Sequence, residues 1–252
     1  MLGDRYYCGL DIGADKIKVA VLHSRDGKNL DLLGAYESKV YGYKDSSVTD
    51  LNDLTDCIHQ TISELTNKIG IKIKEIQLGI SAELIDIRKS STVIPLIERG
   101  SKVIVQRDIK KVNEQARLLS LKMEEEILHN LPQLYNVDDN NMATNPLGLY
   151  GRKLGVESMM IVTKVNTVRN ITKAITQAGF VVASVHFTSF AASQVICSEQ
   201  QRQEGCFLID IGSKATSILV FKGGNLKQLD IVPVGGKNFT ENIAQQMNLP
   251  VD

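Results

Sequence analysis

The sequence has no excess of charge of either sign and no long apolar run. Its 29 lysines and arginines balance 29 aspartates and glutamates, so no overall field attracts the chain to nucleic acid or to an anionic membrane. No apolar run reaches the length of a membrane-spanning helix, and the polar start of the chain differs from a signal peptide. We therefore predict a soluble, cytoplasmic protein without a nucleic-acid partner.

Metal-binding and catalytic patterns are also scarce. The cysteines and histidines are isolated, without the spacing of a zinc site or of a secreted disulfide framework. They are Cys8, Cys57, Cys197, Cys206, His23, His59, His129 and His186. There is no Gly-x-Ser-x-Gly motif and no defensible pair of catalytic carboxylates. The residues themselves therefore predict reduced thiols and no catalytic group.

One four-residue pattern does occur twice. Leu10-Asp11-Ile12-Gly13 returns as Ile209-Asp210-Ile211-Gly212, and each copy stands between two apolar runs. Each is therefore predicted to be a strand, a tight turn and a second strand. A turn with glycine just after an acidic residue directs backbone N–H groups into a concave loop that suits a phosphate. Two facing hairpins would hold a nucleotide from both sides, although ordinary hairpins also produce this pattern.

The chain around the first copy is typical of an α/β unit. We expect a three-stranded meander, an amphipathic helix and a further strand, at residues 6–10, 17–22, 30–37, 51–69 and 76–80. Thr49 or Asp50 is expected to cap the helix, and Gly70 to end it.

From Glu83 the pattern changes, and we predict an inserted α+β subdomain over residues 84–160. Strands are expected near 92–97, 126–138 and 153–165. A long helix is expected to begin at the first-turn carboxylate of Asp108. Its core stripe is predicted to be Ile109, Val112, Ala116, Leu119, Met123 and Ile127.

Beyond the insertion the α/β order resumes and leads to the second copy. A helix over 168–178 is expected to be capped by Asn166 or Thr167 and ended by Gly179. The following elements are predicted at 180–187, 189–199, 206–209, 216–221 and 226–234. Gly235-Gly236 would then open a helix with Phe239, Ile243 and Met247 on its apolar face.

These features resemble the actin, Hsp70 and sugar-kinase superfamily and, within it, the FtsA family of actin-like bacterial cell-division proteins. The more specific signals are the runs at 131–138 (LPQLYNVD) and 145–151 (NPLGLYG). Further matches lie at 9–13, 48–51, 170–179, 206–212 and 232–236. The resemblance covers essentially the whole chain.

The resemblance implies an α/β fold: an actin-like (ribonuclease-H-like) mixed five-stranded sheet with helices, an inserted subdomain of the SHS2 type and the start of a second lobe. It places these at 1–83 with 161–205, at 84–160 and at 206–252. The second lobe is then expected to be incomplete, so the FtsZ and membrane sites of the family would lie outside this chain.

Family members bind ATP, polymerise and link the tubulin-like protein FtsZ to the inner membrane. The resemblance therefore implies ATP and Mg²⁺ as cofactors, FtsZ and other divisome proteins as partners, and filaments at the cytoplasmic face of the division site. It implies at most a weak ATPase. Two alternatives stay open: a small-molecule (sugar-type) kinase of the same superfold, and a truncated relative without nucleotide binding.

The implied nucleotide site draws on both hairpins and on the later glycine pair. Its residues are Asp11, Gly13, Ala14, Asp15, Lys16, Lys18, Asp210, Gly212, Ser213, Lys214, Gly235 and Gly236. Asp11 and Asp210 would hold Mg²⁺ through water, since this ion retains waters and uses one or two carboxylates beside substrate phosphates. Alternatively, each carboxylate accepts N–H groups of its own turn.

Two departures from the family pattern affect this site. The second loop reads Gly212-Ser213-Lys214-Ala215 where the family has three glycines and a threonine. Each lost glycine is expected to cost on the order of 1–2 kcal/mol of conformational free energy if its position requires φ > 0. Lys214 is expected to offset part of this cost by binding a phosphate as a point charge. Asp15 would oppose a phosphate about 6 Å away by about 3 kcal/mol per charge at a dielectric constant of ~20. Lys16 and Lys18, on one strand face, would offset it.

Overall fold

A mixed five-stranded sheet forms the first part of the molecule. The computed structural model describes residues 4–27, 29–97, 100–139 and 141–250. The strands are β1 (Arg5–Ile12), β2 (Lys16–Ser24), β3 (Asp31–Lys39), β6 (Glu75–Ile80) and β13 (Val181–Phe187), in the order β13-β6-β1-β2-β3. The meander β1-β2-β3 is antiparallel, whereas β6 pairs in parallel with both β1 and β13. The predicted antiparallel meander and mixed five-stranded sheet are confirmed.

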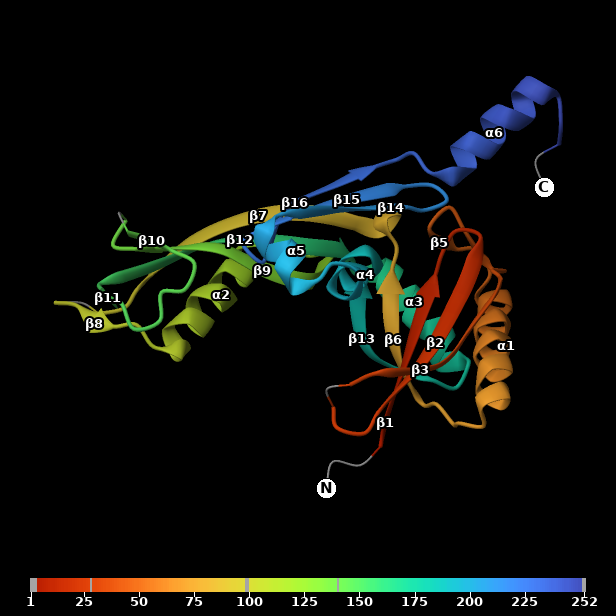
Figure 1. Ribbon diagram of the computed structural model, residues 1–252, viewed down its shortest axis with the longest axis horizontal. Coiled ribbons are helices and arrows are strands. Elements are labelled where there is room, and N and C mark those ends of the chain that lie inside the picture. The colour runs from red at the N-terminus through yellow and green to blue at the C-terminus, as the bar shows by residue number, and fades with distance from the viewer. Residues whose placement is uncertain (1–3, 28, 98–99, 140, 251–252) are drawn as a thin grey trace.

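Two helices, α1 (Leu51–Ile69) and α3 (Val165–Gln177), cover one face of this sheet (Figure 1). The alternating pattern of β1 directs Cys8, Leu10 and Ile12 toward them. These side chains join Leu54 and Ile58 of α1 in a buried core. The opposite residues of β1, including Asp11, are thereby left on the other face of the sheet.

The helix ends of this part test the capping predictions. Asp50 caps α1, because its Oδ1 accepts the N–H groups of Asn52 and Asp53 at 2.8 and 3.0 Å, and Gly70 ends the helix at φ 70°. For α3 the capping prediction is wrong. Its N-cap is Lys164, without a side-chain hydrogen bond, so the two residues predicted as caps lie inside the first turn.

The inserted part is a four-stranded antiparallel sheet with one helix. Its strands are β7 (Ile85–Pro95), β9 (Glu125–Val137), β10 (Asn141–Ala143) and β12 (Lys153–Lys164), in the order β10-β9-β12-β7. The helix α2 (Gln106–Ser120) packs Val112 and Ala116 against Val156 and Met160 of β12. A small pair, β8 (Lys102–Val103) and β11 (Tyr150–Gly151), completes this part.

The predicted core stripe of α2 is wrong in its second half. The backbone leaves the helix at Leu121 (ψ 130°), so the stripe stops at Ala116. Leu119 is 66% exposed and Met123 is fully exposed, while Ile127 belongs to β9. The apolar spacing continues across a turn that carries neither glycine nor proline, so no residue in the sequence marks the helix end.

A three-stranded antiparallel sheet forms the last part. It consists of β14 (Cys206–Ile211), β15 (Thr216–Lys222) and β16 (Asn225–Val232), and the chain reaches it through α4 (Thr188–Ile196) and α5 (Glu199–Glu204). The helix predicted over 189–199 is α4, which ends at Ile196, and α5 was not predicted. The buried face of the sheet packs Leu219 and Phe221 against Met159 and Ile161 of β12 and against Phe187.

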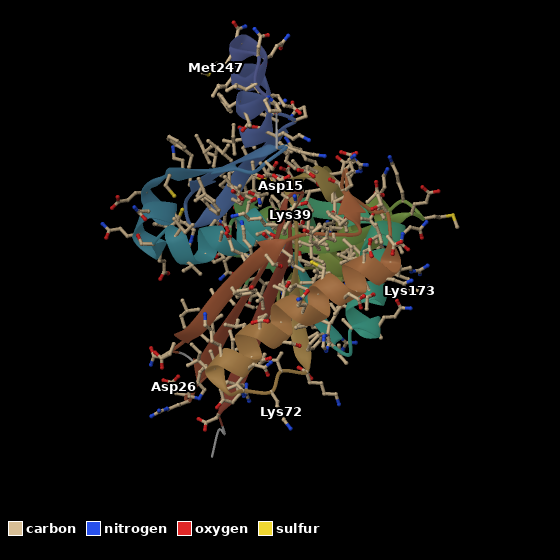
Figure 2. The ribbon with its side chains drawn as sticks, turned by 90° about the vertical axis from the view of Figure 1, so that its right-hand side faces the viewer. Asp15, Asp26, Lys39, Lys72, Lys173 and Met247 are labelled. Atoms are coloured by element: carbon tan, nitrogen blue, oxygen red, sulfur yellow. The ribbon has the colours of Figure 1, made fainter. Side chains whose placement is uncertain are left out.

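Helix α6 (Gly236–Met247) extends away from the sheets (Figure 1), and Figure 2 shows Met247 at its far end. Its predicted apolar residues Phe239, Ile243 and Met247 remain exposed. No helix in the described part of the chain is long and apolar enough to cross a membrane.

Candidate functional site

The two copies of the repeated pattern form the same hairpin. In the first, the N–H of Gly13 donates to the carbonyl of Lys16 at 2.9 Å; in the second, the N–H of Gly212 donates to Ala215, also at 2.9 Å. Strand pairing continues to the residue before each glycine. The sequence repeat therefore produces two turns with the same hydrogen bond.

The glycines of these turns avoid a tight contact and do not have a left-handed backbone. Neither Gly13 nor Gly212 has a positive φ. A Cβ would lie 3.1 Å from the Lys16 oxygen at the first and 3.0 Å from the Ala215 oxygen at the second. Ser213 and Lys214 also lack positive φ, so the expected penalty for losing glycines there does not arise.

Both turns open onto one cavity of about 480 Å³. Most of the predicted residues line it: Asp11, Gly13, Ala14, Asp15, Lys16, Lys18, Asp210, Gly212 and Ser213. Figure 2 shows Asp15 at the end of the first sheet nearest the three-stranded sheet, with Asp26 at the opposite end. The cavity thus lies where the two sheets approach each other.

Neighbouring hydroxyls at the start of α4 hold the two aspartates of the repeat. Thr188 Oγ1 donates to Oδ1 of Asp11 at 3.1 Å, and Ser189 Oγ donates to Oδ2 of Asp210 at 2.6 Å. Ser189 Oγ also contacts Ser217 Oγ at 3.1 Å. Among the described residues, neither carboxylate accepts an N–H of its own turn. Each carboxylate is instead held toward the cavity by α4.

Thr188 and Ser189 were missed from the sequence. They directly follow β13 and begin α4, next to the usual position of a helix cap. Here Phe187 is the N-cap and makes no side-chain bond, so both hydroxyls are available to the aspartates. Gly79 makes room, because a Cβ there would lie 2.6 Å from Thr188 Oγ1.

The electrostatics of Asp11 favour a bound cation. Burial raises the pKa of its carboxyl, the Thr188 bond and the charge of Lys18 lower it, and the nearby Asp210 raises it again. A partly desolvated carboxylate beside a second one is relieved by positive charge. The described residues contain no cluster of three or more metal-ligating side chains, so any cation here would need waters or a ligand as well.

The predicted lysines differ in where their side chains pair. Lys16 and Lys18 line it, but the ammonium of Lys16 forms an ion pair with Glu37 on the neighbouring strand. Within the described part of the chain, the lining does not include Lys214, Gly235 or Gly236. Lys214 pairs with Asp45 instead.

The glycine pair supports the second turn from behind. The N–H of Gly236 donates to the carbonyl of Gly212 at 2.8 Å, and the N–H of Lys237 donates to that of Ser213, also at 2.8 Å. A Cβ at Gly235 would lie 2.4 Å from the Gly212 oxygen. The pair is therefore placed to fix the turn and not to contact a ligand in the cavity.

The cavity has features that fit a phosphate. Ser213 lines the cavity, and its buried Oγ has no hydrogen-bond partner among the described residues. Neither Gly13 nor Gly212 places a Cβ between the backbone and the cavity. A bound phosphate would supply the acceptor that the Ser213 hydroxyl lacks.

Two family models match the chain. One describes the SHS2 domain inserted in FtsA and matches residues 83–163; the other describes the cell division protein FtsA and matches residues 207–252. The chain belongs to the FtsA family. Its similarity to curated FtsA proteins extends over nearly its whole length.

Three FtsA proteins illustrate this similarity. The chain is 27% identical over 250 residues to that of Buchnera aphidicola subsp. Baizongia pistaciae (strain Bp), covering 99% of this chain and 59% of that one. It is 26% identical to those of Bacillus subtilis (strain 168) and Escherichia coli (strain K12), covering 97% and 96% of this chain and 55% and 57% of theirs. The chain therefore spans little more than half the length of these FtsA relatives.

Solved structures support the fold assignment. The PilM-PilN type IV pilus biogenesis complex matches with a TM-score of 0.68 at 19% identity, covering 97% of this chain and 66% of that one. The ethanolamine utilization protein EutJ from Carboxydothermus hydrogenoformans matches with a TM-score of 0.52 at 13% identity, covering 98% and 58%. At these identities the likeness concerns the fold alone. The FtsA-family chain has a mixed α/β actin-like fold with an inserted SHS2 subdomain.

Proposed function

We propose that this chain is the nucleotide-binding part of an FtsA-type cell-division protein and binds ATP with Mg²⁺ between its two hairpins. One observation carries the proposal: Asp11 and Asp210, from two different sheets, line the same cavity and are each held by a hydroxyl of α4. We propose the following division of the chain: the first actin-like subdomain comprises residues 1–83 and 161–205, the insertion residues 84–160, and the second subdomain residues 206–252.

The phosphates would contact the two hairpin turns. Their backbone is open at Gly13 and Gly212, the buried hydroxyl of Ser213 would donate to a phosphate oxygen, and Lys18 would contribute positive charge. Asp15, which also lines the cavity, opposes this binding by charge repulsion. Lys18 lies on the same side of the cavity and offsets part of this repulsion.

Mg²⁺ would be held by Asp11 and Asp210 through water, and it supplies positive charge that neutralises the phosphates when bound. Thr188 and Ser189 fix the orientation of the two carboxylates before any ligand arrives. Because the raised pKa of Asp11 reflects a disfavoured negative charge, a cation nearby stabilises the ionised carboxylate.

We further propose that the full protein self-associates into filaments and links the FtsZ ring to the membrane and to other divisome proteins. The curated relatives named "Cell division protein FtsA" support this role. The protein would act at the cytoplasmic face of the inner membrane at the division site, as at most a weak ATPase. No residue of this chain is assigned to the FtsZ or membrane contacts.

Isothermal calorimetry with ATP and Mg²⁺ tests the nucleotide proposal, with a thermal melt to confirm that each protein is folded. We expect a dissociation constant of about micromolar order, on the scale where 1 μM equals −8.2 kcal/mol, and clear weakening when EDTA removes the metal. Asp210→Asn should weaken binding, whereas Asp230→Asn, an exposed change on β16 of the same sheet, should not.

Absence of ATP binding by folded wild-type protein would contradict the proposal. Transfer of phosphate from ATP to a hydroxyl-bearing metabolite would instead identify a small-molecule kinase. Sedimentation of the full protein with and without FtsZ tests the adaptor role separately, because it measures assembly and not nucleotide affinity.

A further inference from the structure

An ion pair connects the two sides of the cavity at its edge. The ammonium of Lys214 pairs with the carboxylate of Asp45, and the two residues are 169 positions apart in the chain. Lys214 belongs to the turn of the second hairpin. Asp45 belongs to the turn between the short strands β4 (Tyr43–Lys44) and β5 (Ser47–Val48), which lead into α1 of the first part.

The Asp45 turn is anchored at the edge of the cavity. Asp45 and Ser46 take left-handed φ angles of 49° and 59°, as the two-residue turn of a tight hairpin requires. The Ser46 hydroxyl donates to the carboxylate of Glu83, and Glu83 lines the cavity. The turn therefore holds Asp45 in a fixed position facing the second hairpin.

Lys214 is close to the cavity although its ammonium is directed to Asp45. The residues on both sides of it, Ser213 and Ala215, line the cavity. Its pair with Asp45 is partly exposed to solvent, with 71% of the Asp45 side chain and 25% of the Lys214 side chain accessible. Exposed ion pairs are weak, so a stronger anion near the turn can replace Asp45 at small cost.

We propose that the Lys214 ammonium exchanges the Asp45 carboxylate for a nucleotide phosphate, so that phosphate binding breaks the ion pair. Lys214 is the switch residue of this exchange. This proposal rests on the proposed nucleotide site. A triphosphate carries more charge than one carboxylate and attracts the ammonium more strongly. Release of Asp45 then frees the β4-β5 turn from the second hairpin, so occupancy of the cavity is transmitted to the contact between the two parts.

A double-mutant cycle on the affinity for ATP with Mg²⁺ tests the exchange. Calorimetry is done on the wild type, Asp45→Asn, Lys214→Gln and the double variant. Asn tolerates the left-handed angle of position 45, so the turn is kept. We expect Asp45→Asn to tighten binding about three- to five-fold, because the phosphate no longer displaces a competing carboxylate. Lys214→Gln should weaken binding, and in its background Asp45→Asn should have no effect.

The chain offers a matched control for Asp45. Asp139 also has a left-handed φ, of 65°, and pairs with a lysine, Lys153, at 3.5 Å; its side chain is 65% exposed. It lies in the inserted subdomain and does not line the cavity. Asp139→Asn should leave the affinity for ATP unchanged. Adenosine provides a ligand control, since without phosphates its affinity should not respond to Asp45→Asn.

Three outcomes overturn the switch while leaving nucleotide binding intact. The first is weaker or unchanged ATP binding by Asp45→Asn. The second is an equal gain in ATP affinity from Asp45→Asn whether residue 214 is Lys or Gln. The gain would then come from reduced repulsion between Asp45 and the phosphates and not from Lys214. The third is an equal gain for adenosine. Absence of ATP binding by folded wild type and by all variants would instead overturn the nucleotide proposal, and the switch with it.

Discussion

Ser189 holds Asp210 by a short hydrogen bond, from Oγ to Oδ2 at 2.6 Å. Ser189 is 2% exposed and also contacts Ser217, which is buried. In Ser189→Ala, Asp210 loses its hydroxyl donor and Ser217 loses its hydroxyl partner, and we expect a loss of about 1–3 kcal/mol in the free energy of unfolding. Urea unfolding measures this loss, and calorimetry should show weaker ATP binding.

Ser193→Ala is the control for this change. Ser193 is equally buried on α4, but its hydroxyl donates to the carbonyl of Phe190 in the same helix. It should affect stability without changing nucleotide affinity. Wild-type affinity in Ser189→Ala would show that Asp210 does not depend on this bond.

Gly13→Ala should disturb the first turn. The added Cβ would lie 3.1 Å from the Lys16 carbonyl, which is backbone and can yield only by distorting the turn. We expect a loss of stability of about 1 kcal/mol and at least a tenfold loss of ATP affinity, on the scale where 1.4 kcal/mol is a factor of ten. Gly9→Ala, on β1 before this turn, is the control, since its Cβ would meet nothing within 4 Å. Equal affinities for the two variants would remove the first turn from the site.

Met123→Asp should leave the stability of the inserted subdomain within about 0.5 kcal/mol of wild type, because its side chain is fully exposed. The sequence had predicted the opposite. Val112→Asp, on the buried side of α2, should cost more than about 4 kcal/mol, because it places an unpaired charge in the core. Chemical unfolding of both variants measures the difference, and comparable losses would contradict the position of Met123.

His129 should make stability depend on pH. Burial, and to a smaller extent His186, lowers the pKa of His129 to about 4, against an ordinary value of 6.5. Between these values the unfolded chain binds a proton that the folded chain does not, so stability falls as the pH falls from about 6.5 to about 4. Its Nε2 also accepts the N–H of Phe187 at 3.0 Å, which a protonated ring cannot do.

Thermal melts at several pH values measure this effect. For a partly exposed ring we expect a loss of about 1–2 kcal/mol over the interval, after allowing for screening by solvent. His129→Gln keeps an acceptor but does not titrate, so its loss in the same interval should be smaller. Parallel curves for the two proteins would assign the pH dependence to other groups.

Local signals in the sequence predicted much of the fold. The cap at Asp50 and the end of α1 at Gly70 were predicted because both depend on bonds within a few residues. The end of α2 was missed because no breaker marks it and the apolar spacing continues through Met123. Periodicity describes which residues face one way, but not where tertiary packing stops a helix.

The candidate site was predicted only in its repeated part. Thr188 was missed because its partner Asp11 is 177 residues away, and no local pattern connects them. The glycine requirement was recognised, but its cause was not. A close carbonyl, and not a left-handed angle, disfavours a side chain at Gly13, and this depends on the three-dimensional turn.

Thr188 and Ser189 are consecutive in the chain, and each holds the aspartate of a different hairpin. Consecutive Cα atoms lie about 3.8 Å apart whatever the rest of the structure does. The start of α4 therefore joins the two hairpins: while both hydrogen bonds persist, the two carboxylates stay beside adjacent residues of one helix. The Lys214–Asp45 pair is a separate contact between the two parts. A cation bound near Asp11 and Asp210 and the Lys214–Asp45 ion pair can therefore respond to a ligand independently of each other.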